Sequence, residues 1–212
     1  MRIYKLMDQY ILSQASIVRS SQSSPQELKD ALREMGREIG KKVIEKFYIK
    51  NMEIVTPMGS KTTSPFPQIP LSIVFTTKGD MEHFGAGLSR SLRNSMIGYM
   101  NFEGRRGTEA LNSPIRDIML PSVKGKTVDS IFIAKSVLAT GCTAISLTRK
   151  ALSEYVPDKV IIVTAFYSTR GLEDLTAEFP NAHIFVVDDP DDLEENGLLV
   201  PGIGLLEERL TA

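Results

Sequence analysis

A short run of small and hydroxyl-bearing residues, Ser-Val-Leu-Ala-Thr-Gly-Cys-Thr at 136–143, is the segment best suited to bind an anion. It separates a predicted strand from a predicted helix. Amide groups at a helix N-terminus carry the positive end of the helix dipole, and the hydroxyls of Thr140 and Thr143 could add donors to a phosphate monoester. Equally, Thr143 could only cap the helix, with Gly141 permitting a tight turn. The segment lacks the Lys-Ser or Lys-Thr ending of a P-loop.

Basic side chains on two predicted loops could add positive charge beside a bound phosphate. Lys78 directly follows a predicted strand, and Arg105 and Arg106 lie between two glycines in a predicted mobile loop at 101–113. A turn lysine is also an ordinary solvated residue, and loop arginines alone usually contribute only solubility. These residues therefore gain meaning only if the fold brings them to the 136–143 turn.

The predicted elements on either side of these residues alternate between helix and strand. Ser24-Pro25-Gln26-Glu27 predicts a capped helix start, and apolar residues at three- and four-residue steps continue the helix to Phe47. The proline-rich stretch at 58–70 predicts a long loop. We predict further strands at 71–77, 114–120, 128–134, 159–166 and 182–187, and helices at 84–99, 144–155 and 172–179. This alternation predicts an α/β fold, an open and mostly parallel sheet flanked by helices, with the ligand at the carboxyl ends of the strands.

Length and composition predict one globular domain. The chain has 212 residues, and its 25 Lys and Arg nearly balance its 26 Asp and Glu, so no global positive field exists to bind nucleic acid or an anionic membrane. Cys142 is the single cysteine and can form no internal disulfide, while His83 and His183 have no spacing typical of a zinc site. No run reaches the length of a membrane helix. We expect a cytoplasmic enzyme or ligand-binding protein.

Four segments resemble the uracil phosphoribosyltransferase family. Lys135–Thr143 reads Lys-Ser-Val-Leu-Ala-Thr-Gly-Cys-Thr where the family has Asp-Pro-Met-Leu-Ala-Thr-Gly-Gly-Ser. Ile115–Val128 resembles the family's lysine-leucine-proline hairpin, and Glu53–Gly59 resembles its early Glu-Thr-Pro strand. Leu193–Gly204 resembles the family segment Leu-Asn-Glu-x-Gly-Tyr-Ile-Val-Pro-Gly-Leu-Gly. The segments occur in the expected order, so the resemblance covers nearly the whole chain.

The resemblance implies a phosphoribosyltransferase-like domain over 1–212, with N-terminal helices at 1–50, a core sheet at about 51–188 and a base-side hood at 189–212. It implies transfer of ribose 5-phosphate from phosphoribosyl diphosphate to uracil, which yields UMP and pyrophosphate. Mg²⁺ is expected to arrive with phosphoribosyl diphosphate. Charge develops on the ribose and on the leaving pyrophosphate, so fixed donors and cations matter more than a nucleophile. Family members assemble as dimers or larger homo-oligomers, and the same is expected here.

The resemblance also assigns binding residues. The phosphate-cradling turn is matched by Ala139, Thr140, Gly141, Cys142 and Thr143. Lys78 falls where the family has the arginine of an Arg-Ala-Gly turn, and Arg106 falls where a loop arginine closes over pyrophosphate. The residues expected beside the base, a pyrimidine or the base of a nucleoside monophosphate, are Leu199, Gly204, Leu205 and Leu206.

Three residues depart from the family pattern inside this implied site. Lys135 stands where the family has an aspartate that accepts hydrogen bonds from ribose hydroxyls, and a lysine has no acceptor. Leu205 replaces the first acid of the family's Gly-Asp-Ala-Gly-Asp segment, and Leu198 replaces a base-side tyrosine. The catalytic residue is therefore left unassigned, and two alternatives stay open. One is a non-catalytic sensor of nucleotide or phosphoribosyl diphosphate, and the other is transfer to a different base.

Overall fold

One mixed sheet forms the centre of the protein. The computed structural model describes residues 2–102, 107–112, 115 and 117–211. The strand order is β1-β11-β9-β7-β4-β5-β6, and every neighbouring pair is parallel except β5 and β6. The strands are β1 (Ile3–Leu6), β4 (Ser72–Thr77), β5 (Ser95–Asn101), β6 (Asp117–Met119), β7 (Thr127–Ala134), β9 (Val156–Thr164) and β11 (His183–Val187). The predicted open, mostly parallel α/β sheet is confirmed.

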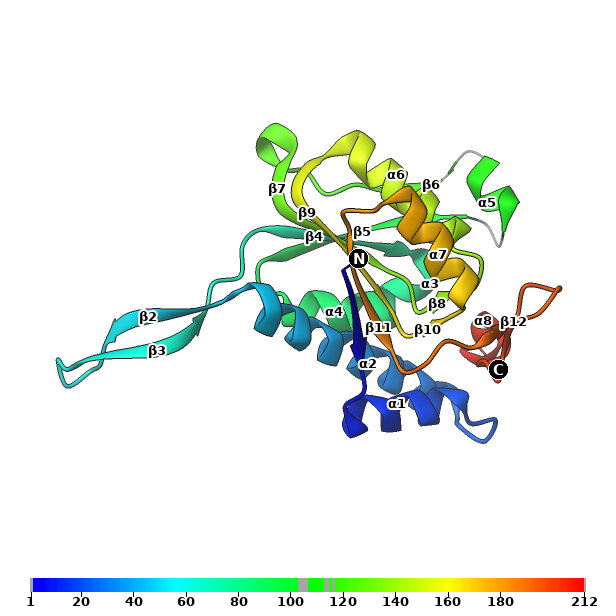
Figure 1. The fold of residues 1–212 in the computed structure, drawn as a ribbon, viewed down its shortest axis with the longest axis horizontal. Coiled ribbons are helices and arrows are strands. Elements are labelled where there is room, and N and C mark those ends of the chain that lie inside the picture. Colours follow the sequence, from blue (N-terminus) through cyan, green and yellow to red (C-terminus); the bar gives the residue numbers. More distant parts are fainter. Residues whose placement is uncertain (1, 103–106, 113–114, 116, 212) are drawn as a thin grey trace.

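Helices cover both faces of this sheet (Figure 1). On one face lie α1 (Gln9–Arg19), α2 (Pro25–Phe47) and α4 (Ala86–Ser91), and on the other lie α6 (Cys142–Glu154) and α7 (Thr169–Glu178). A short helix, α5 (Thr108–Asn112), lies near α6. The predicted start of α2 is confirmed, since Ser24 and Glu27 form a reciprocal capping box ahead of Pro25.

Alternate residues of the strands divide the core into two layers. Val74 on β4 belongs to the layer under α1 and α2, whereas its neighbours Ile73 and Phe75 belong to the layer under α6 and α7. All three side chains are fully buried. Because both faces are covered, the central strands are almost continuously apolar, as the sequence of 159–166 predicts.

A hairpin projects from the body of the protein (Figure 1). Its antiparallel strands, β2 (Ile49–Val55) and β3 (Lys61–Pro67), pair along their whole length. The prediction of a long loop at 58–70 is wrong over β3, where Pro65 and Pro67 are accommodated because a strand in an isolated pair leaves one edge without a hydrogen-bonding neighbour. The hairpin also lies outside the central sheet. The core sheet expected from about residue 51 therefore begins later in the chain, with β4.

Two other boundaries differ from the expectation. The helix predicted at 84–99 ends with α4 at Ser91, and the strand β5 follows it. Met96 and Tyr99 fit a helical stripe, but this stretch instead fills the gap between β4 and β6, where Gly98 lies against the ring of Phe75. The N-terminal segment is not only helical, because β1 joins the sheet beside β11.

Short elements at the strand ends complete the fold. They are α3 (Lys78–Asp80), the π-helical turn η1 (Met81–Gly85), the 3-10 turn η2 (Lys124–Lys126), β8 (Val137–Leu138), β10 (Phe166–Tyr167), β12 (Asp192–Leu193), β13 (Leu199–Val200) and α8 (Leu206–Arg209). Within the described ranges, none of the helices combines the length and apolar character required to cross a membrane.

Candidate active site

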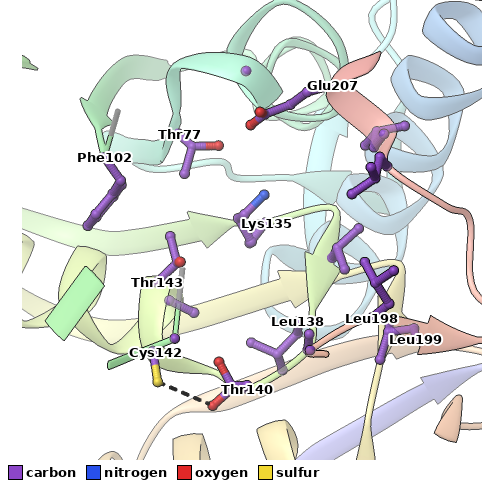
Figure 2. A pocket seen from close by; sticks show the side chains of 18 of the residues that line it. Thr77, Phe102, Lys135, Leu138, Thr140, Cys142, Thr143, Leu198, Leu199 and Glu207 are labelled. Carbon is purple, nitrogen blue, oxygen red and sulfur yellow. Dashed lines mark hydrogen bonds between the residues drawn. The ribbon is translucent and has the colours of Figure 1, made fainter. Parts of the chain in front are cut away.

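A pocket of about 540 Å³ lies at the carboxyl ends of β4 and β7. Its walls come mainly from residues 77–80, 135–144 and 195–210. These segments are far apart in the chain, but β4 and β7 are parallel neighbours, so the turns that follow them meet at one edge of the sheet. The C-terminal segment closes the opposite side. Figure 2 shows polar groups on one side of the pocket and leucines on the other.

The 136–143 turn is held in shape by two glycines. Gly141 precedes α6 with φ +76°, a left-handed conformation that glycine adopts without strain. A Cβ on Gly171, in the first turn of α7, would lie 2.3 Å from the carbonyl oxygen of Ala139. The Ser168 hydroxyl donates a hydrogen bond to the same carbonyl. The start of α7 therefore supports the turn from behind.

The turn directs hydroxyl and amide donors toward the pocket. Thr140, Cys142 and Thr143 are half-buried and line it. The first amide groups of α6 have no partner within the helix, and its first turn contains no acidic residue, so this end of the helix favours an anion. The Cys142 thiol lies 3.8 Å from the carbonyl oxygen of Thr140 (Figure 2). The arrangement can hold a phosphate through neutral donors.

Lys135, at the end of β7, is paired with an aspartate that sequence reasoning missed. Its Nζ lies 2.6 Å from Oδ2 of Asp80, whose side chain is only 4% exposed. Asp80 also accepts hydrogen bonds from the Ser136 hydroxyl and from Thr77 Oγ1 at 3.1 Å. Burial alone would raise the pKa of Asp80, but attraction to Lys135 and the hydrogen bonds from Lys135 and Ser136 together lower it. Asp80 is therefore a fixed carboxylate, and it holds Lys135 in place.

Of the two other predicted cations, Lys78 lies within the described residues and Arg106 does not. Lys78 lines the same pocket, is 57% exposed and pairs with Asp117 at 3.2 Å. An exposed pair of this kind is weak, so Lys78 can turn to a ligand at little cost. The predicted pyrophosphate contact of Arg106 lies outside the described residues.

The C-terminal segment supplies an apolar wall. The predicted base-side residues Leu199, Gly204, Leu205 and Leu206 all line the pocket, as does Leu198. Figure 2 shows Leu198 and Leu199 beside Leu138 from β8, which is almost fully buried. Apolar side chains suit the faces of a planar base, while backbone groups remain to contact its edge.

Two arginines fasten this wall to α1. Arg19 forms a bidentate pair with the buried Asp191, at 2.8 and 2.9 Å, and donates to the carbonyl oxygen of Gly202 at 3.0 Å. Arg209 on α8 donates to the carbonyl oxygens of Val18 and Ile203 at 2.7 and 2.8 Å. The guanidinium group of arginine has five N–H donors in one plane, so it can make several such contacts at once. The position of the apolar wall therefore depends on residues nearly two hundred positions away in the chain.

Of the residues that sequence reasoning left without a site role, Glu207 on α8 also lines the pocket. Its carboxylate reaches across to the turn at Gly79, within 3.7 Å of where a Cβ on that glycine would lie, and Figure 2 shows it opposite Lys135. The sequence contained a signal for Asp80, because Lys78-Gly79-Asp80 places a charged residue at the glycine of the family's Arg-Ala-Gly turn. It contained no such signal for Glu207. His83 and His183, to which no role was assigned, are absent from the pocket wall.

The sheet, the 136–143 turn, called the phosphate-type turn below, and the apolar wall of the C-terminal segment together define a phosphoribosyltransferase-like α/β protein. Residues 6–210 match the family model described as "Uracil phosphoribosyltransferase". The chain belongs to this family.

Individual relatives agree with that assignment. The chain is 26% identical over 210 residues to a uracil phosphoribosyltransferase of Aquifex aeolicus, covering 99% of this chain and 98% of the relative. It is 23% identical to that of Sulfolobus acidocaldarius, covering 96% of each. A solved structure of an Aquifex aeolicus protein superposes with a TM-score of 0.79 at 26% identity, covering 98% of this chain and 97% of the other.

Proposed function

We propose that the protein transfers ribose 5-phosphate from phosphoribosyl diphosphate to uracil, producing UMP and pyrophosphate for pyrimidine salvage. One observation carries this proposal. The segments that the family resemblance assigns to phosphate, pyrophosphate and base line a single pocket of about 540 Å³. That volume is in the usual range for a small-molecule site, roughly 300–1,000 Å³.

The chain's own residues can serve each part of such a substrate. The Thr140 and Thr143 hydroxyls and the amides at the start of α6 suit the 5′-phosphate. Lys78 and Lys135 supply positive charge where pyrophosphate would leave. The leucines of the C-terminal segment suit the base and exclude water from the reacting carbon.

Magnesium enters this proposal only as an ion carried by the substrate. Among residues of known placement, there is no group of three His, Cys, Asp or Glu side chains that could hold a metal. The position where the family has an acid carries the ammonium of Lys135, which repels a cation. These residues do not fit a metal held by the protein.

We also infer that the protein works as a homodimer or larger assembly in the cytoplasm, with small-molecule partners rather than nucleic acid or membrane. The projecting hairpin supports assembly, because Val55 and Met58 are 66% and 89% exposed. The free thiol of Cys142 suits a reducing compartment, and a net charge of −1 disfavours nucleic acid. Sedimentation tests the assembly, and a monomer at working concentration would contradict it.

The activity is tested by measuring pyrophosphate and UMP from purified protein, phosphoribosyl diphosphate, Mg²⁺ and uracil. Thr140→Ala and Thr143→Ala should each lower kcat/KM by about ten- to a hundredfold, the scale of one hydrogen bond to a charged group. Thr176→Ala is the matched control, because its hydroxyl donates to Leu172 on α7, away from the pocket. A wild-type protein that forms no UMP or pyrophosphate would contradict the proposal, and product formation that survives both turn substitutions would show that the 136–143 turn does not bind the substrate.

Two observations favour second candidates. Lys135 is an anchored cation where the family has an acceptor, which favours a sensor that binds phosphoribosyl diphosphate or a nucleotide without turnover. The leucines at 198, 205 and 206 favour a more apolar base than uracil. Binding without product from any base supports the sensor, and product from another base alone supports the changed specificity.

A further inference from the structure

The ammonium of Lys135 is fixed at the floor of the pocket. It follows directly after β7, lies beside the phosphate-type turn and remains 20% exposed, so it is within reach of a ligand. An ammonium has three N–H donors, and Asp80 takes one of them at 2.6 Å. The other two remain for a ligand, because Lys135 lines the pocket, where Figure 2 shows its side chain between Thr143 and Glu207.

Asp80 is not available to a metal ion. Its Oδ2 accepts from Lys135 and Thr77, and its Oδ1 accepts from the Ser136 hydroxyl. A metal would have to displace the buried Ser136 hydroxyl and the partly buried Lys135 and Thr77 and leave these donors unpaired, which is costly. Asp80 therefore serves to hold Lys135 rather than to bind a cation.

The other charges at the pocket lie at its rim. Lys78 is exposed, and so are the carboxylates of Glu109, Glu195 and Glu207. Solvent screens exposed charges far more than partly buried ones, so they act on a bound ligand less than Lys135 does. At the floor, the single charge directed at a ligand by the described residues is the ammonium.

We propose that Lys135 takes the charge-neutralising role of a divalent cation, so that phosphoribosyl diphosphate binds to this protein without Mg²⁺. The inference rests on the proposed function, because it concerns the same ligand and pocket. Lys135 would donate to a pyrophosphate oxygen or a ribose hydroxyl of the ligand, while Asp80 keeps it charged and oriented. No covalent step is involved.

Isothermal titration of the full-length protein tests this directly. The Kd for phosphoribosyl diphosphate is measured in Mg²⁺ and in EDTA. The wild type should differ by less than about threefold between the two buffers. Lys135→Met should bind at least about tenfold more weakly in EDTA, the scale of one charge-assisted hydrogen bond, and should recover part of that loss in Mg²⁺.

Two further variants keep the test decisive. Lys135→Met leaves the buried Asp80 carboxylate without its partner. The double variant Asp80→Asn/Lys135→Met removes that charge as well, so the floor of its pocket is neutral. It should show the same loss of affinity in EDTA as the single variant. The matched control is Lys159→Met, because Lys159 also pairs with an aspartate, Asp129 at 3.2 Å, but at the amino ends of the strands. It should leave both Kd values unchanged.

The outcomes separate this inference from the proposed function. Wild-type binding that disappears in EDTA and returns with Mg²⁺ would overturn the inference while leaving the activity intact. An unchanged Kd for both Lys135 variants in EDTA would overturn it as well. Absence of binding in either buffer would overturn the inference and the proposed function together.

Discussion

Lys135 and Asp80 are 55 positions apart in the chain, yet their side chains meet at 2.6 Å on the floor of the pocket. The contact follows from the register of two neighbouring parallel strands. Thr76 on β4 lies opposite Ala134 on β7, so the residues that leave the two strands emerge side by side. A cation at the end of one strand is thereby matched by a buried anion in the turn after the other.

The first prediction concerns the stability of this pair. Lys135→Met should lower the free energy of unfolding at neutral pH by about 3–5 kcal/mol, because it leaves a buried carboxylate uncompensated. Asp80→Asn/Lys135→Met should recover most of that loss, since it removes the orphaned charge. Urea denaturation measures both. A single variant as stable as the wild type would show that Asp80 is not buried as a charged group.

A second prediction concerns acid. The pKa of Asp80 is lowered in the folded protein, so the unfolded chain binds the proton more readily. The pair therefore contributes its full stability above the unfolded value, about 3.9, and loses it as the pH falls through the folded value.

The wild type and Asp80→Asn/Lys135→Met should accordingly differ in stability by a constant amount from pH 7 to about pH 5. Below about pH 4 the wild type should lose stability faster. Thermal unfolding across this series measures the difference. Parallel curves down to pH 3 would be inconsistent with a lowered pKa.

A third prediction concerns the support behind the phosphate-type turn. Gly171→Ala would place a Cβ 2.3 Å from the carbonyl oxygen of Ala139, so α7 or the turn must move. We expect a stability loss of about 1–3 kcal/mol and weaker binding of ribose 5-phosphate.

Gly59→Ala is the control for that substitution. It lies at the tip of the hairpin with φ +77° and open space around it, so it should cost only backbone strain and leave ligand affinity unchanged. Calorimetric titration with ribose 5-phosphate measures the Kd of both variants. Equal affinities would show that the turn tolerates the displacement.

A fourth prediction treats Arg19 as a positioning residue for the apolar wall. Arg19→Lys keeps the charge but loses the bidentate contact to Asp191 together with the bond to Gly202. The KM for the base should rise about tenfold with little change in the KM for phosphoribosyl diphosphate.

Arg149→Lys provides the comparison, because Arg149 pairs with Glu178 on the exposed surface of α6 and α7. Steady-state kinetics with each substrate varied in turn separates the two constants. If Arg19→Lys raised both KM values equally, Arg19 would have only a general structural role.

Local sequence patterns predicted an element correctly where that element depends on residues close together in the chain. The capping box at Ser24 and Glu27 begins α2 as predicted, because both partners lie within one turn. The strand prediction at 71–77 held for β4 because burial on both faces requires an apolar run. The helix predicted at 84–99 was wrong in its second half. Met96 and Tyr99 have helical spacing, but this stretch forms β5 and completes the sheet.

The α/β class, the turn at 136–143 and the family could be predicted from the amino-acid sequence, because they depend on short-range patterns of hydrophobicity, capping and motif. Three contacts could not be predicted in this way: Asp80 faces Lys135, Glu207 reaches the pocket, and Arg19 holds the C-terminal wall. Those contacts join residues from separate strands and helices. They depend on which distant strands become neighbours and on how the helices pack against them, and no single short segment encodes that arrangement.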